Sequence, residues 1–514
     1  MKKSKLKSAL LILSAIILSV IVFACGANPE NEGVLNVNDE DAAQNRDASG
    51  ENDVQSEEEE TESGNSIEER PDYELPERNL GGYDFRILSR SEAANIHWWN
   101  YDISVEEESG DPIDDAVFRR NQKVEELYNI NIVNIPNNSV GSTASRSIRA
   151  GSDDYDIVVI GLRDGQESLM TDGHLSDLNA VPNIDLTRPW WDQKAVEQLS
   201  INNKLFATAC DLTVRDKDAI IILMFNKQLM RDYELGDIYS LVSSGKWTLD
   251  KMHEMMRTVS RDITGDGAMG LDDQYGLLSQ YRHSEYLFNA AGEYISKLNA
   301  QKIPEITVYN ERAALVSDKI AEMQGDRNIT MHAEQGSGVA ADIWDGFQVP
   351  FFAEGRALFY HAGMNRVALL RTMEQDFGIL PPPKFDENQE NYHAAVDAWC
   401  MSAVSVPITA DKDKAGLILE TLAYESRYIL LPAYYDVNLK TKFARDEESS
   451  AMIDIILNNR LYDLGDIFYW GNAVQFFENL SQGRGDSLAT YWERDRDRVA
   501  SAMDRTLERL DNVE

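Results

Sequence analysis

The chain has 514 residues, with 88 Asp and Glu against 49 Lys and Arg, and a formal net charge of −39 at pH 7. Such an acidic surface repels polyanions, which argues against nucleic acid or an anionic lipid surface as the ligand. Because 43% of the residues are hydrophobic, the chain can bury a large core, and its length suggests two or more compact units.

The N-terminus has the pattern of an export signal. Four lysines within the first seven residues precede a charge-free apolar run over 9–24, which is shorter than the roughly 20 residues that span a bilayer. The sequence VFACG (22–26) is similar to the lipobox of bacterial lipoproteins, in which a small residue precedes the cysteine that receives a lipid such as palmitate. This resemblance predicts a signal peptide over 1–24, a lipid on Cys25 and a location on the extracellular face of a bacterial, Gram-positive cell membrane. An uncleaved membrane anchor is the alternative.

The segment after Cys25 has very few apolar side chains that could form a core. Between residues 26 and 78 there are 18 Asp and Glu against 3 Arg. Such a composition cannot offset the entropy cost of ordering the chain. We therefore expect a disordered acidic tether over 25–78.

Apolar periodicity from residue 79 onward predicts alternating strands and helices. Strands are predicted over 83–89, 130–135, 156–161, 219–226 and 356–363, with helical segments between them. This order indicates a parallel sheet covered by helices, and hence an α/β fold. A helix over 248–259 carries an apolar stripe of four residues that we expect in the core: Met252, Met255, Met256 and Val259. A strand around Trp399 precedes helices that continue to the C-terminus, of which 486–513 is predicted to be the longest.

The loop DITGDGAMGLDDQYG (262–276) matches two motifs. Its glycines spell GxGxxG, a phosphate-binding pattern, but they follow a helix instead of a strand, and the surrounding aspartates would repel a pyrophosphate. The other motif is a calcium loop, in which the ligands would be Asp262, Thr264, Asp266, the carbonyl of Ala268 and Asp273. We expect a weak structural calcium site, with an affinity of the order of 10⁻⁴ to 10⁻³ M. An acidic loop without metal is the alternative.

Several blocks of sequence occur in an order that resembles a known family. These are GKWTLDKM (245–252), FFAEGRALFY (351–360), FGILPPPK (377–384) and LPAYYDVNLKTK (431–442), after the lipobox and the first strands. Together they look like the extracellular solute-binding proteins of ABC importers, in the carbohydrate-binding, maltose-binding-protein-like branch. The resemblance implies a two-lobed, periplasmic-binding-protein-like type II fold with three hinge crossings.

The resemblance also implies a division into lobes. The crossings would lie near 211–219, 354–357 and 397–402. Lobe 1 would contain 79–213 and 357–398, and lobe 2 would contain 214–356 and 399–514. The implied function is a membrane-tethered subunit that captures a sugar or oligosaccharide between its lobes and delivers it to the permease, with no organic cofactor and no enzymatic activity.

A sugar site combines aromatic rings, which stack on the apolar sugar faces, with polar groups for the hydroxyls. The residues that we expect to contact the ligand follow predicted strands, lie at the crossings or match a stacking position in relatives: Trp98, Trp99, Asp164, Asp211, Asn365, Trp399, Tyr469 and Trp470. Trp247 and Trp492 are expected to have packing roles. Arg163 and Arg366 neighbour the predicted site, and the alternative to a ligand role is that they are simply solvated surface charges.

Two other functional classes stay open at this point. A secreted glycosidase or lyase would also have an acidic cleft with aromatics, because glycoside hydrolysis needs only two carboxylates at a set separation. The chain has seven His and lacks the HExxH, GxSxG and P-loop motifs of zinc, serine and phosphoryl-transfer enzymes. A peptide-binding importer subunit or a surface adhesin would share the tether and the fold.

Two cysteines remain besides Cys25. Cys210 lies beside the first implied crossing and Cys400 beside the third. If these hinge segments are neighbours, a disulfide is geometrically possible, because paired strands lie about 5 Å apart. The alternative is a pair of buried, unbonded cysteines that pack as small apolar side chains.

Overall fold

The computed structural model describes residues 70, 73–74, 76–93, 97–436 and 447–513. The predicted signal peptide, Cys25 and nearly all of the acidic tether therefore lie outside the described residues. Among the helices that are described, none is both long and apolar enough to cross a membrane.

The first lobe is built on a four-stranded sheet in the order β12-β3-β1-β2. The strands are β1 (Tyr83–Arg90), β2 (Ile130–Asn137), β3 (Ile157–Ile160) and β12 (Ala403–Ser405). β1 pairs in parallel with β2 and β3, which confirms the predicted parallel sheet, and β12 joins the edge of β3 in antiparallel orientation.

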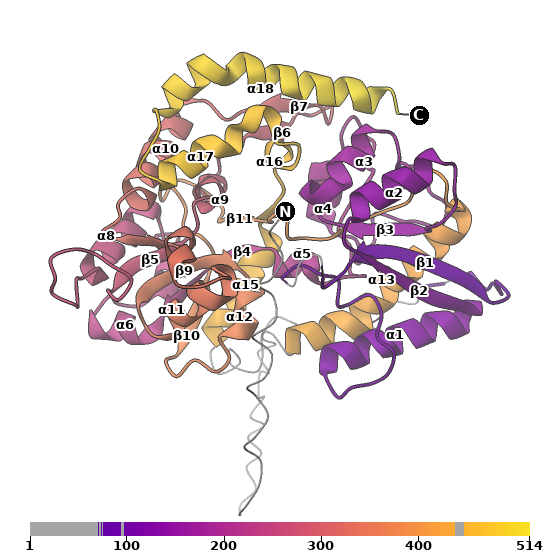
Figure 1. Ribbon diagram of the computed structural model, residues 1–514, viewed down its shortest axis with the longest axis horizontal. Helices are drawn as coiled ribbons and strands as arrows, with labels where there is room; N and C mark the ends of the chain where they lie inside the picture. The colour runs from indigo at the N-terminus through magenta and orange to yellow at the C-terminus, as the bar shows by residue number, and fades with distance from the viewer. Residues whose placement is uncertain (1–69, 71–72, 75, 94–96, 437–446, 514) are drawn as a thin grey trace, which may run out of the picture. The chain divides into compact units, whose positions relative to one another are not determined.

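Helices cover both faces of this sheet. They are α1 (Pro112–Tyr128), α2 (Val140–Arg149), α3 (Glu167–Thr171), α4 (Gln193–Leu199) and α13 (Lys412–Tyr435). Figure 1 shows α1 beside α13 on one face and α2 with α3 on the other. The start of α1 is fixed locally, since the Asp111 side chain accepts the amides of Ile113 and Asp114 and Pro112 occupies the first helical turn.

The second lobe is built on a five-stranded sheet in the order β10-β4-β9-β5-β8. The strands are β4 (Ile221–Asn226), β5 (Tyr275–Ser279), β8 (Thr330–His332), β9 (Ala357–Gly363) and β10 (Phe377–Leu380). β5 pairs in parallel with β8 and β9, whereas β4 pairs in antiparallel orientation with β9 and β10.

The second lobe contains many further helices, of which α16 and α17 lie near α18 (Leu488–Asp511) (Figure 1). They are α6 (Lys227–Asp232), α7 (Ile238–Ser243), α8 (Leu249–Val259), α9 (His283–Ala290), α10 (Glu311–Gln324), α11 (Val349–Ala353), α12 (Arg366–Leu369), α15 (Glu447–Asn458), α16 (Leu464–Ile467) and α17 (Ala473–Ser481). Two small sheets add β6 (Ser296–Leu298) with β7 (Pro304–Ile306), and β11 (Ala394–Ala395) with β13 (Arg460–Leu461). The predicted apolar stripe on α8 is buried, which confirms its place in the core.

The predicted division into lobes is wrong in its second half. β9 and β10 pair with β4, so residues 357–398 belong largely to the second lobe and not to lobe 1. Conversely, β12 pairs with β3 and α13 packs beside α1, so this part of 399–514 belongs to the first lobe. The predicted crossing at 354–357 is only the turn between α11 and β9 within one lobe.

Among the residues that the structure describes, two passages nevertheless connect the lobes. The first runs over 211–219 and contains the short helix α5 (Arg215–Asp218), as predicted. The second runs over 397–402, between β11 and β12, and was also predicted. The C-terminal helix α18 (Leu488–Asp511) also reaches the first lobe, where Arg509 pairs with Asp172. It was predicted to be the longest helix, and its 24 residues equal those of α13.

Several tryptophans are core residues with satisfied indole groups. Trp190 and Trp191 are buried, and they donate to the two carboxylate oxygens of Glu420 at 2.9 and 2.8 Å. Trp247 is fully buried and donates to the Pro381 carbonyl at 3.1 Å, which confirms its expected packing role. The ring of Trp492 stacks on Tyr309 with 6.0 Å between ring centroids, so it also has a packing contact.

Candidate ligand-binding cleft

A pocket of about 670 Å³ lies at the carboxyl ends of the parallel strands β1, β2 and β3. This is the end at which open α/β sheets present their ligand sites. Three predicted ligand residues line it together, namely Trp98, Asp164 and Trp399. The rest of the lining is mostly polar and includes Asn137, Asn138, Ser139, Ser142, Ser145, Arg149, Ser168 and Asp172.

Trp399 is the most accessible aromatic of this pocket, with 45% of its surface exposed. Its backbone amide donates to the Asp397 side chain at 2.9 Å, which fixes the turn that carries it. The guanidinium of Arg163 lies 5.4 Å from the Trp399 ring centroid and 3.9 Å from that of Tyr469. The structure therefore brings two predicted aromatic residues, Trp399 and Tyr469, to the same arginine.

Trp98 and Trp99 have different surroundings although they are neighbours in sequence. Trp98 lines the pocket, and its ring centroid lies 5.5 Å from the Arg215 guanidinium and 5.9 Å from that of Arg366. Trp99 is absent from the pocket lining and packs edge-on against Tyr101 with 5.9 Å between centroids.

Three further predicted ligand residues are not part of the lining of this pocket. Trp470 is buried in the core, stacks on Phe468 and donates to Thr506 at 3.0 Å, so its face is already covered. Asp211 is buried and pairs with Lys217 at 2.8 Å and Arg427 at 3.3 Å. Asn365 is the N-cap of α12, where its backbone N–H donates to the Asp218 carbonyl at 3.1 Å, and the role of its side chain in ligand binding stays a prediction.

Arg163 and Arg366 form ion pairs that join different segments, so they are not the solvated charges that the sequence allowed. Arg163, which follows β3, pairs with Asp466 of α16 at 2.8 Å, and Arg282 pairs with the same carboxylate at 2.5 Å. Arg366 is buried and pairs with Asp345 at 2.7 Å. Asp466 thus connects the first lobe with the second.

Arg90, at the end of β1, is a key residue that the sequence analysis missed. Its guanidinium donates to the carbonyls of Trp399, Cys400 and Met401 at 2.9, 3.0 and 2.9 Å, and to the Ser402 hydroxyl at 2.7 Å. Burial lowers the pKa of Arg90 to about 10. The only sequence signal was a charged residue at the end of a buried strand, and it does not reveal which segment the charge contacts.

Asp164 lies beside this arginine and faces the pocket. Its carboxylate is 3.8 Å from Arg90, and 42% of its side chain is exposed. Partial burial raises its pKa, and Arg90 counteracts that effect. Asp164 is therefore an accessible acceptor for ligand hydroxyl groups.

The first crossing contains a buried network of charges. All four residues of α5 are buried, and Lys217 pairs with Asp211 and with Asp216, the latter at 3.1 Å. Arg215 pairs with Asp218 at 2.8 Å. Burial raises the pKa of Asp216 to about 6 although Lys217 lies beside it. This network fixes the conformation of the crossing.

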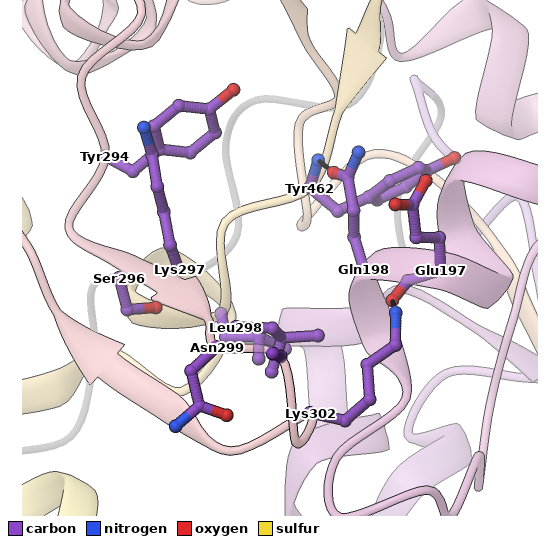
Figure 2. A pocket seen from close by; sticks show the side chains of 11 residues that line it. Glu197, Gln198, Tyr294, Ser296, Lys297, Leu298, Asn299, Lys302 and Tyr462 are labelled. Atoms are coloured by element: carbon purple, nitrogen blue, oxygen red, sulfur yellow. Dashed lines mark hydrogen bonds between the residues drawn. The ribbon is translucent and has the colours of Figure 1, made fainter.

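A second pocket, of about 480 Å³, lies between α4 and β6 and contains none of the predicted ligand residues. Figure 2 shows Tyr294 and Lys297 on one side of it and Tyr462 on the other. Lys302 donates to the Glu197 carbonyl at 2.9 Å, and the Lys297 ammonium lies 4.0 Å from the centroid of the Tyr294 ring. Both lysines are thus engaged by neighbouring residues.

The predicted calcium loop is a tight turn closed by a bridge between Arg261 and Gln274. Asp262 accepts the amides of Gly265 and Gly267 at 2.6 and 2.8 Å, and Asp273 accepts three more amides of the loop. These hydrogen bonds lower the pKa of both aspartates. Both oxygens of each of these two carboxylates therefore already accept hydrogen bonds within the loop, and calcium binding stays a prediction.

Cys210 and Cys400 are both buried and unbonded, so the structure contains no disulfide among the residues that it describes. Burial raises the pKa of each thiol. The packing alternative is therefore the one that the structure supports.

Comparisons with known proteins agree with this architecture at the level of the fold. No family model matches the chain, and no curated protein matches it. Among solved structures, an ABC substrate-binding protein from Listeria monocytogenes in complex with cycloalternan is similar, with 11% identity, a TM-score of 0.50, and coverage of 84% of this chain and 99% of that chain. A cyclo/maltodextrin-binding protein complexed with maltotetraose has 14% identity, a TM-score of 0.52, and coverage of 86% and 100%. The chain therefore has the two-lobed α/β fold of these substrate-binding proteins.

Proposed function

We propose that the protein is the extracellular substrate-binding subunit of an ABC importer and that it captures a sugar or oligosaccharide between its lobes. The observation that carries the proposal is the pocket at the strand ends, where Trp98 and Trp399 lie beside Asp164 and a row of serine and asparagine side chains. Aromatic rings stack on sugar faces, and hydroxyl, amide and carboxylate groups bind sugar hydroxyls. The two similar structures, which were solved with carbohydrates, support the same choice of ligand.

Attachment to the membrane is a separate part of the proposal. It rests on the lipobox-like sequence at Cys25 and on the acidic composition of the segment that follows. A lipid on Cys25 would hold the protein at the extracellular face of the membrane, and the tether would allow the lobes to reach the permease.

A binding role fits the cleft better than an enzymatic role. The solved structures with the same fold are binding proteins. In the pocket, Asp164 lies near Arg90, and Asp172 pairs with Arg509, so both carboxylates have cationic neighbours. The proposal therefore assigns these groups to recognition of the ligand and not to catalysis.

A thermal-shift screen over neutral mono- and oligosaccharides, with maltotetraose included, tests this proposal. A ligand that binds only the folded protein raises the melting temperature, and the rise grows with the logarithm of the free ligand concentration above Kd. We expect at least one sugar to do so, and we expect Trp399→Ala to weaken its affinity about tenfold, as the loss of one stacking contact predicts. Trp492→Ala is the matched control, because it removes an indole outside the pocket.

Two results would contradict the proposal. One is a screen in which no sugar raises the melting temperature of the wild-type protein. The other is a sugar that binds Trp399→Ala as tightly as Trp492→Ala, which would place the site elsewhere in the molecule.

A further inference from the structure

Among the residues that the structure describes, one group of three potential metal ligands comes together, and it lies outside the pocket lining. His97 belongs to the loop after β1 in the first lobe, whereas Asp342 and Asp345 lie between β8 and α11 in the second lobe. Their ligand atoms all lie within 4.8 Å of one another, and all three residues are half-buried. The cluster therefore connects the two lobes.

The two carboxylates are oriented so that one oxygen of each faces the imidazole. Asp345 Oδ2 lies 2.9 Å from His97 Nδ1, and Asp342 Oδ2 lies 3.3 Å from His97 Nε2. The other oxygen of each carboxylate has a different partner. Asp345 Oδ1 pairs with Arg366 at 2.7 Å, and Asp342 Oδ1 accepts the Trp344 amide at 3.0 Å. Outer contacts of this kind orient the ligands in metal sites.

Two carboxylates face a single imidazole, one at each ring nitrogen. Arg366 pairs with Asp345 and so balances one of the two negative charges. A divalent cation at this position would be attracted by both carboxylates.

The ligand types indicate which cation. One imidazole nitrogen and two carboxylate oxygens suit a late first-row divalent ion, above all zinc, whereas calcium prefers oxygen ligands only. Zinc–ligand distances of 2.0–2.2 Å separate neighbouring ligand atoms by about 3.3 Å in a tetrahedral site. The two observed separations involve different ring nitrogens, so only one of them can belong to a single site, and the other carboxylate must rotate toward the same nitrogen.

We propose that His97, Asp342 and Asp345 bind one zinc ion, or a similar divalent transition-metal ion, that links the two lobes beside the ligand cleft. A link across the lobes favours the conformation in which they are close. By reciprocity, an ion that favours this conformation raises the affinity for any ligand held between the lobes, and the ligand raises the affinity for the ion. This second effect rests on the proposed sugar-binding function, whereas zinc binding does not.

Calorimetric titration of chelator-treated full-length protein with zinc chloride at pH 7.5, without sugar, tests the site. We expect one zinc ion per chain and loss of this binding in both His97→Ala and Asp345→Asn. His393→Ala is the matched control and should retain the stoichiometry, because His393 packs beside Tyr294 and its charged neighbours are cations. With cobalt in place of zinc, the wild-type protein should show the visible absorption of a nitrogen- and oxygen-bound ion, a readout that needs no variant.

The proposal is overturned if the wild-type protein binds no zinc, or if His97→Ala binds it as the wild type does. Absence of binding together with a doubly protonated His97 ring in NMR spectra would identify the cluster as an ion pair between the lobes. If zinc binds but no sugar does, the metal site stands and the proposed function fails.

Discussion

Replacement of Arg90 by methionine tests whether this residue holds the second crossing. The substitution removes the donor to the carbonyls of Trp399, Cys400 and Met401. The Ser402 hydroxyl keeps a partner, because Asn100 also donates to it at 2.9 Å. The expected result is a less stable protein whose crossing is no longer fixed to the end of β1.

The magnitude follows from two opposing effects. Three carbonyl oxygens lose their donor, two of them buried and that of Trp399 partly buried, at a cost of about 1–3 kcal/mol each. Removal of the charge has the opposite effect, because burial lowers the pKa of Arg90 from 12.5 to about 10. That change corresponds to a cost of about 3 kcal/mol for the buried charged form. The difference leaves a net destabilisation of about 3 kcal/mol.

Urea denaturation followed by circular dichroism measures this change. Arg119→Met is the matched control, because the Arg119 side chain is 58% exposed and its carboxylate partner is 3.9 Å away. An exposed pair of this kind contributes less than about 1 kcal/mol. If Arg90→Met is no less stable than Arg119→Met, the crossing does not depend on Arg90. Sugar affinity should fall as well, since the same segment carries Trp399.

Three other predictions concern the calcium loop, the first crossing and the cysteines. Calcium should raise the melting temperature of the wild-type protein, and the double substitution Asp262→Ala with Asp266→Ala should abolish this rise; a full response in the double variant would refute the ligand assignment. Because burial raises the pKa of Asp216 to about 6, the folded state binds its proton more tightly than the unfolded state does, so this group adds stability as pH falls from about 7 to 4. Asp216→Asn removes the ionised group, so the gain in stability relative to the wild type should be about 2 kcal/mol larger at pH 7.5 than at pH 4, as paired urea titrations would show; an equal difference at both pH values would contradict this. Cys210 and Cys400 should resist alkylation in the folded protein and titrate as two free thiols after denaturation, whereas a count of zero would reveal a disulfide.

Local structure was predictable where a single segment determines it. The strand predicted over 83–89 became β1, and the helix predicted over 248–259 became α8, because alternating or helical apolar spacing depends only on neighbouring residues. The lobe assignment of 357–398 failed because strand pairing is not local. β9 is equally apolar whichever sheet it joins, and only its hydrogen bonds to β4 and β5 decide the lobe.

The candidate site was predictable in part for the same reason. Trp98, Asp164 and Trp399 lie at strand ends or at a crossing, which the sequence order reveals, and they meet in one pocket. Trp470 follows Tyr469 directly but points into the core, where it stacks on Phe468. Arg90 reaches a segment about 310 positions away in the chain, and no local pattern shows such a contact.

The central claim, that a sugar is held between the two lobes, is tested most directly by small-angle scattering with and without a saturating sugar. Lobes joined by hinge segments close around a ligand in the cleft. The account predicts a smaller radius of gyration in the presence of the sugar that stabilises the protein. An unchanged radius at saturation, with binding confirmed by calorimetry on the same sample, would contradict it.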